Sequence, residues 1–266
     1  MKENNYFAGI DVGSTFCKAV IINAGDNSIA ARSFSPIKGD PEKASLTCLK
    51  DLSKKVKTSS RKLKKKSLAT GLNADKISIK EKESEITCIG RGSYELNPEL
   101  DIVVDVGSFS MKALKLGEKG KITDFMKNYR CAAGSGVLLE LVAEGLELKI
   151  TELAEIAEQS TEPIPISSQC SIFAESEVIS YKNEGANIPD LIAGVCNSVA
   201  GRIYPLVKML DKEAKNVAFS GGVAKNKWIV QNLEERLELR LNQLPLEPEY
   251  VGAYGAALIA KEREEN

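Results

Sequence analysis

The sequence predicts an α/β fold of two similar domains that face each other across a cleft. An apolar strand that runs into aspartate, glycine and serine occurs near residue 11 and again near residue 105, and a second apolar strand follows each copy. A third glycine-bearing turn, at residues 220–222, follows strand-like residues and precedes a helix. An internal repeat of this kind indicates two similar domains, and the order and spacing of the three turns strengthen that prediction.

The composition excludes several classes of function. The 266 residues are 43% hydrophobic and 27% charged, which suffices for two domains with their own cores. The 36 Lys and Arg residues and 37 Asp and Glu residues nearly cancel, so neither nucleic acid nor a membrane is an expected partner. No signal peptide or spanning apolar run occurs, and six scattered cysteines favour a reducing cytoplasm. Histidine is absent, so carboxylates, water and thiolates must carry any chemistry.

The first motif, within residues 6–22, is expected to be a β-hairpin that binds phosphates. Backbone amides and hydroxyls at its tip can hold phosphate oxygens. Asp11, at the end of the first strand, is the candidate catalytic carboxylate and can hold Mg²⁺ through water. A tight glycine hairpin also forms without any ligand, so that alternative stays open. The candidate nucleotide contacts are Gly13, Ser14, Thr15 and Lys18.

The second motif and the third turn extend the same site. In residues 102–116, Asp105 is the second candidate catalytic carboxylate, and Gly107 and Ser108 are candidate cofactor contacts. In the third turn, Gly221 and Gly222 allow the backbone to approach a flat ligand such as a nucleoside. A helix is expected beyond Asn226, after this turn.

Two cysteines are each expected at the start of a helix. Cys131 opens the segment CAAGSG, which precedes an apolar-periodic run, and helix N-termini favour the reactive thiolate. Cys170 follows serines suited to N-capping and precedes carboxylates and a second apolar run. Two thiolates are too few for a tetrahedral sulfur site or a 4Fe-4S cluster, but a symmetric dimer would supply the missing pair. A lone buried cysteine is the alternative for Cys131.

Small residues beside Cys131 let backbone amides approach a bound group, so they are candidate cofactor contacts: Gly134, Ser135 and Gly136. The remaining cysteines lack a glycine-rich or capped helix start and are expected to be packing residues: Cys17, Cys48, Cys88 and Cys196.

The domain boundary is expected at Asn97-Pro98, which interrupts both helix and strand. Residues 1–96 form the first domain, with a basic helix at 41–57, a strand at 66–70 and the C-terminal helix 253–264 packed back on it. Residues 97–252 form the second, with a long helix from 189 through 207. The basic run at 54–66 is expected to be a solvated helix face, with an acidic partner or nucleic acid as the alternative.

The three turns resemble those of the superfamily of acetate and sugar kinases, Hsp70 and actin. The two cysteine motifs look like one branch of it, the ATP-dependent activators of 2-hydroxyacyl-CoA dehydratases, which are grouped with the ATPase subunits of benzoyl-CoA reductases (BadF/BadG/BcrA/BcrD type). The resemblance covers essentially the whole chain. It implies two actin-like (ribonuclease H-like) domains that bind ATP or ADP with Mg²⁺ in the cleft between them.

The resemblance also implies the activity. In that family a homodimer holds one 4Fe-4S cluster between its subunits, with two cysteines from each, which match Cys131 and Cys170 here. ATP in each cleft changes the angle between the cysteine-headed helices. The ATPase then passes one electron to a partner dehydratase or reductase metalloenzyme, with a ferredoxin or flavodoxin as the electron source, in an anaerobic cytoplasm.

The chain departs from the family pattern after Gly107. The family continues with glycine, glutamine and aspartate, whereas this chain has Ser108, Phe109 and Ser110, so a water-orienting position has become aromatic. Two other readings stay open: a cluster-free small-molecule kinase or regulatory ATPase of the same fold, in which Asp105 serves phosphoryl transfer, and a zinc-bridged dimer.

Overall fold

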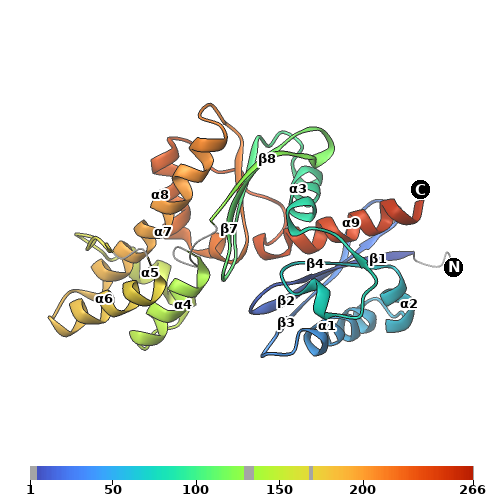
Figure 1. Ribbon diagram of the computed structural model, residues 1–266, viewed down its shortest axis with the longest axis horizontal. Coiled ribbons are helices and arrows are strands. Elements are labelled where there is room, and N and C mark those ends of the chain that lie inside the picture. Colours follow the sequence, from blue (N-terminus) through green and yellow to red (C-terminus); the bar gives the residue numbers. More distant parts are fainter. Residues whose placement is uncertain (1–4, 129–134, 168–169, 266) are drawn as a thin grey trace. The chain divides into compact units, whose positions relative to one another are not determined.

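The computed structural model describes residues 5–128, 135–167 and 170–265, which form two compact units (Figure 1). The first unit comprises Met1–Leu100, Leu116–Thr123 and Leu244–Asn266, and the second comprises Asp101–Lys115 and Asp124–Gln243. Each unit has its own mixed β-sheet and helices, so the predicted α/β class is confirmed. None of the helices in the described ranges has both the length and the apolar character needed to cross a membrane.

The sheet of the first unit is built around one buried strand. β1 pairs with β2 in antiparallel fashion and with β4 in parallel fashion, and the sheet order is β3-β2-β1-β4-β5. Seven residues from Tyr6 to Val12 form β1, and all but the first are buried. The strands are β1 (Tyr6–Val12), β2 (Phe16–Asn23), β3 (Ile29–Pro36), β4 (Ser67–Thr70) and β5 (Glu81–Lys82).

Helices cover both faces of this sheet. Side chains at alternate positions of β1, such as Ala8 and Ile10, share a core with Leu49 of α1. On the other face α9 packs so closely that a Cβ added to Gly9 would lie 1.9 Å from the Ala253 carbonyl oxygen. The helices are α1 (Pro41–Lys55), α2 (Ser60–Lys65), α3 (Glu85–Leu96) and α9 (Val251–Glu265), so the predicted basic helix at 41–57 and strand at 66–70 are confirmed.

The second unit repeats this arrangement. β6 (Ile102–Val106) pairs in antiparallel fashion with β7 (Met111–Leu116) and in parallel fashion with β9 (Val217–Ser220), and β8 (Ile122–Lys127) completes the order β8-β7-β6-β9. In the register, Asp105 lies opposite Lys112 and Ser220, just as Asp11 lies opposite Lys18 and Thr70 in the first unit. The predicted internal repeat is therefore confirmed.

Five helices supply the rest of the second core, which gathers apolar side chains of β6, β7 and β9 with those of the helices. They are α4 (Gly136–Gly145), α5 (Leu153–Ala157), α6 (Ser171–Asn183), α7 (Ile188–Leu210) and α8 (Lys227–Leu237). Asn187 caps α7 by accepting a hydrogen bond from the Asp190 amide, which confirms the predicted helix from residue 189. Short 3₁₀ turns occur at Ala74–Lys76, Glu118–Gly120, Ile150–Glu152, Gly222–Lys225 and Pro248–Tyr250.

Candidate functional site

Asp11 lies next to the end of β1 with one carboxylate oxygen paired and the other open. Its Oδ2 lies 2.6 Å from Lys18 Nζ, across the hairpin. Its Oδ1 is buried, and no hydrogen bond reaches it from the part of the chain that the structure describes. A buried carboxylate oxygen without a donor is costly, so this atom is suited to a group that the protein binds, such as a cation or its water.

The hairpin tip beside Asp11 is held in one shape. The Gly13 amide donates to the Phe16 carbonyl at 3.0 Å, and the Asn73 side-chain amide donates to the Gly13 carbonyl at 2.6 Å. Ser14 and Thr15 are partly exposed at this tip. The structure therefore brings the predicted contacts Gly13, Ser14, Thr15 and Lys18 to the end of the hairpin that carries Asp11. Asn73 follows a glycine-bearing turn at residues 69–71, but nothing in the sequence predicts its bond to Gly13.

Asp105 lies in the equivalent place in the second unit, but both of its oxygens are bonded. Oδ1 lies 2.9 Å from Lys112 Nζ, and Oδ2 accepts a hydrogen bond from the Ser220 hydroxyl at 2.9 Å. Lys112 is only 1% exposed and Ser220 is fully buried. This buried network ties together the ends of three neighbouring strands, which makes Asp105 a structural anchor. Sequence reasoning missed Lys112, although the same Asp-to-Lys spacing occurs at Asp11 and Lys18.

A glycine with positive φ follows the parallel strand in each unit. Gly71 follows β4 with φ 93°, and Gly221 follows β9 with φ 85°. A Cβ at Gly71 would lie 2.4 Å from Asp11 Oδ1, and one at Gly221 would lie 2.3 Å from the Val106 carbonyl oxygen. Only glycine fits at these two positions. Gly222 is exposed with open space around it, and α8 begins beyond Asn226 as predicted.

The helix predicted after the segment CAAGSG is α4, which begins at Gly136 with Ser135 at the N-cap position. Its free amides are predicted to point at a bound group. The first two helix amides, from Gly136 and Val137, donate to carbonyls at the tip of the second hairpin, those of Gly107 and Ser108. These amides are therefore engaged within the unit. Cys131 and Gly134 lie outside the described residues.

Cys170 differs from the other described cysteines because it is partly exposed. It occupies the N-cap position of α6, where serines are predicted, and its side chain makes no capping hydrogen bond. Cys17, Cys48, Cys88 and Cys196 are buried, which confirms them as packing residues, and burial raises the pKa of Cys88 and Cys196 to about 12. The pKa of Cys17 is also raised, first by its hydrogen bond with Cys48 and then by burial.

Two carboxylates fix the segment that leads to Cys170. Glu177 Oε1 accepts hydrogen bonds from the amide and the hydroxyl of Ser167, each at 2.9 Å. Asp190 Oδ1 accepts from the Ser160 hydroxyl at 2.6 Å and from the amides of Thr161 and Glu162. The Ser160 hydroxyl, followed by the Glu162 amide, lowers the pKa of Asp190. This segment is thus bonded to both α6 and α7.

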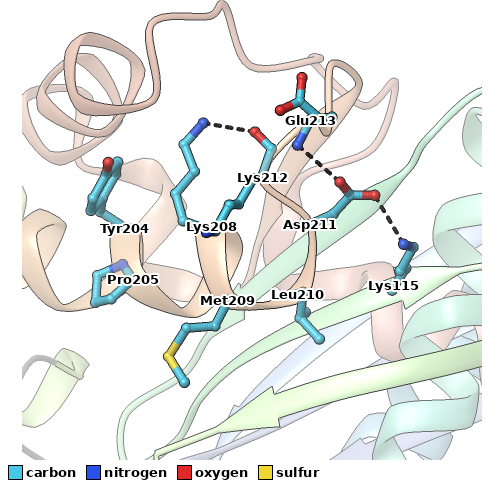
Figure 2. Close-up of a pocket in the computed structure, with 9 residues that line it drawn as sticks. All are labelled: Lys115, Tyr204, Pro205, Lys208, Met209, Leu210, Asp211, Lys212 and Glu213. Atoms are coloured by element: carbon cyan, nitrogen blue, oxygen red, sulfur yellow. Dashed lines mark hydrogen bonds and ion pairs between the residues drawn. The ribbon is translucent and has the colours of Figure 1, made fainter.

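Three other features take no part in the hydrogen bonds described above. Phe109, at the tip of the second hairpin, is 53% exposed. The basic run is largely exposed, with Lys54, Lys57 and Arg61 open to solvent. The hollow in Figure 2 is lined by Lys115 and by the end of α7 with the residues after it, where Asp211 pairs with Lys115 Nζ at 2.9 Å. It contains none of the predicted site residues.

The described residues contain no group of three His, Cys, Asp or Glu side chains placed to hold a metal ion. Of the predicted metal ligands, Asp11 and Cys170 are described, and they lie in different units. A zinc ion or an iron–sulfur cluster at Cys170 would therefore need ligands from outside the described part of one chain.

Comparisons with known proteins identify the family. A model described as the BadF/BadG/BcrA/BcrD ATPase family matches residues 8–260. The activator of lactoyl-CoA dehydratase from Anaerotignum propionicum is 40% identical over 264 residues, 97% of this chain and 98% of that protein. The (R)-2-hydroxyglutaryl-CoA dehydratase activating ATPase of Acidaminococcus fermentans is 36% identical over 259 residues, 96% of each.

Solved structures agree. The activator of the 2-hydroxyisocaproyl-CoA dehydratase from Clostridium difficile, with bound ADPNP, superposes with a TM-score of 0.89 at 34% identity, covering 98% of this chain and 96% of that one. This similarity confirms the predicted actin-like α/β fold class.

Proposed function

The chain belongs to the BadF/BadG/BcrA/BcrD ATPase family, and we propose that it is an ATP-dependent activator that donates single electrons to a partner 2-hydroxyacyl-CoA dehydratase or related reductase. The names of its relatives support the activator role and the dehydratase partner. The observation that carries the electron-donor role is the partly exposed Cys170 at the start of α6, in contrast to the four buried cysteines.

The nucleotide is ATP or ADP with Mg²⁺. The partly exposed tip at Gly13, Ser14 and Thr15 offers amides and hydroxyls to phosphate oxygens, and Lys18 supplies a positive charge beside them. The Asp11 Oδ1, which accepts no hydrogen bond from the described residues, is suited to a water molecule held by Mg²⁺. The corresponding groups of the second unit are Gly107, Ser108, Gly221 and Gly222.

In the second unit, Asp105 acts through its neighbours. With one oxygen bonded to Lys112 and the other to Ser220, it holds the ends of β6, β7 and β9 in register. Asp105 thereby positions Gly107 and Gly221 for binding of the nucleotide. The exposed Phe109 has no polar group that could orient an attacking water.

The electron carrier is a 4Fe-4S cluster held by Cys131 and Cys170 from each subunit of a homodimer. When bound, it supplies a one-electron redox couple. The fit rests on the accessible Cys170 and on its neighbours Ile172 and Phe173, which are 65% and 68% exposed. Adjacent exposed apolar side chains are suited to burial against a second subunit. A ferredoxin or flavodoxin in an anaerobic cytoplasm would supply the electron.

The test is iron and acid-labile sulfide per dimer after purification without oxygen. We expect about four irons in the wild type, as a cubane cluster requires, and almost none in Cys170→Ala. The matched control is Cys196→Ala, since Cys196 is buried in the second core, and it should keep its iron. ATP affinity should persist in both variants.

Two results would overturn the proposal. Absence of iron in the wild type, even after anaerobic reconstitution, would favour a cluster-free kinase or regulatory ATPase. A stoichiometry of one zinc per dimer with no iron would favour a structural zinc bridge.

A further inference from the structure

Ser135 holds the N-cap position of α4 but does not cap the helix. Its side chain accepts no hydrogen bond from the first turn, and its hydroxyl donates to the Ser108 carbonyl at 2.7 Å. The serines at the starts of two other helices behave differently, because Ser59 accepts from the Lys62 amide and Ser84 accepts from the Thr87 amide. The Ser135 hydroxyl is thus committed to the second hairpin, and the residue is only 1% exposed.

Two backbone bonds reinforce this contact. The Gly136 amide donates to the Gly107 carbonyl, and the Val137 amide donates to the Ser108 carbonyl, both at 2.9 Å. The approach is close, since a Cβ added to Gly136 would lie 3.2 Å from the Ser108 Cα. Three hydrogen bonds therefore join the first turn of α4 to the tip of the second hairpin.

The first hairpin is anchored in another way. The Gly13 carbonyl, which corresponds to that of Gly107, accepts from the side chain of Asn73 in the loop that follows β4. Asn73 precedes the short 3₁₀ turn Ala74–Lys76, and in the described residues no α-helix start is bonded to the carbonyls of Gly13 or Ser14. The two hairpins thus share their shape but are bonded to different elements. A displaced tip would pull on α4 in the second unit and on the loop after β4 in the first.

The contact continues from α4 to the helix that begins after Cys170. At the far end of α4, a Cβ added to Gly145 would lie 2.9 Å from Ile179 Cδ1 of α6. Lys182 Nζ, also of α6, donates to the Gly145 carbonyl at 3.5 Å. Because packed helices move as bodies and do not deform smoothly, a shift of α4 is passed to α6.

We infer that Ser135 is a positioning residue that fastens α4 to the second hairpin, so that nucleotide-dependent movement of Gly107 and Ser108 reaches α4 and α6. This inference rests on the proposed function, because it requires the nucleotide to contact that hairpin. A ligand shifts such an element only through different interactions with its two states. ATP and ADP differ by the γ-phosphate, so we expect α4 to take a different position with each nucleotide.

The test is hydrogen exchange of the full chain with Mg²⁺ and either ADP or ADPNP. In the wild type, amides 138–145 should exchange at different rates with the two nucleotides. With each nucleotide at saturating concentration, Ser135→Ala should remove at least half of that difference, because it removes the hydroxyl bonded to the Ser108 carbonyl. Gly136→Ala should also reduce the difference, because its Cβ would push α4 away from Ser108. This second variant replaces Ser135→Ala if the latter folds poorly.

Ser84→Ala is the control, since it removes a true helix cap from α3 and should leave the α4 difference unchanged. Equal α4 exchange with both nucleotides in a wild type that binds them would overturn the inference and leave the proposed function intact. A full α4 difference in both variants would overturn it as well. A wild type that binds neither nucleotide would overturn the proposed function, and this coupling with it.

Discussion

Asp11 and Asp105 occupy equivalent strand positions, yet their carboxylates are bonded differently. Both lie opposite a lysine on the return strand. On the parallel strand, the Ser220 hydroxyl donates to Asp105, whereas the Thr70 hydroxyl opposite Asp11 makes no hydrogen bond with that carboxylate, and none reaches Asp11 Oδ1 from the described residues. One oxygen of the first carboxylate therefore lacks a hydrogen bond from the described residues, whereas both oxygens of the second are bonded. Substituting each by asparagine should separate the two roles.

Asp11→Asn should weaken Mg²⁺-dependent binding of ATP. Asparagine keeps the shape but removes the negative charge that holds a metal-bound water. We expect at least a tenfold loss of ATP affinity with Mg²⁺, or about 1.4 kcal/mol, and little change in EDTA, measured by calorimetry in both buffers. An equal loss in both buffers would show instead that Asp11 acts only by placing Lys18.

Asp105→Asn should lower the free energy of unfolding. It removes the negative charge that lies 2.9 Å from the buried Lys112 ammonium, which costs about 3 kcal/mol or more. Urea unfolding at neutral pH measures the loss. Ser220→Ala removes one neutral donor to the same carboxylate and should cost only about 1 kcal/mol. Unchanged stability of Asp105→Asn, with loss of ATP binding, would place Asp105 in the nucleotide site itself.

At the scale of the element, the turn after β9 depends on one of its two glycines. Gly221→Ala should destabilise the protein by about 2 kcal/mol or more, because φ is positive and the new Cβ would meet the Val106 carbonyl at 2.3 Å. The matched control is Gly222→Ala, where the added Cβ has open space. Thermal unfolding of the two variants compares them directly. Similar melting temperatures would contradict the argument.

The elements that the sequence predicts best are those coded by local pattern. Both hairpins, the basic helix α1 and the long helix α7 follow from apolar runs, caps and turn residues that lie next to each other in the chain. The bonds of Ser135 at the start of α4 could not be predicted. Its side chain makes no capping hydrogen bond, and its hydroxyl donates to the Ser108 carbonyl, 27 residues away. The hydrogen bond from Asn73 to the Gly13 carbonyl could not be predicted either, because it depends on where the loop after β4 passes Gly13.

The site follows the same rule. Aspartates and glycines at strand ends are visible in the sequence, because their motifs are repeated. Whether a carboxylate is open or closed depends on Ser220 and on other contacts over long sequence distances, and no motif records these. Local pattern thus predicts where a site lies, and tertiary contacts decide what each residue does there.

At the scale of the whole molecule, the first unit is completed by the end of the chain. α9 covers the face of the first sheet opposite α1, and Leu68, Cys88 and Ala256 form one apolar cluster there. The fit is close, because a Cβ added to Gly255 would lie 1.7 Å from the Cys88 carbonyl oxygen. The second unit ends at Gln243. Removal of the last segment should therefore unfold one unit and spare the other.

A chain that stops after Gln243 tests this. We expect amides of β1, β2 and β4 to lose protection from hydrogen exchange, because the sheet face under α9 would be exposed to water, while amides of α7 and β9 stay protected. The control stops after Ala260 and removes ion pairs of the last turn, such as Arg263 with Glu83 and Arg91 with Glu262, but leaves the apolar cluster at Leu68 in place. It should keep both units folded. If β1 remained protected without α9, the apolar cluster at Leu68 would be dispensable, and the close backbone contacts at Gly9 and Gly255 would have no part in holding the first unit together.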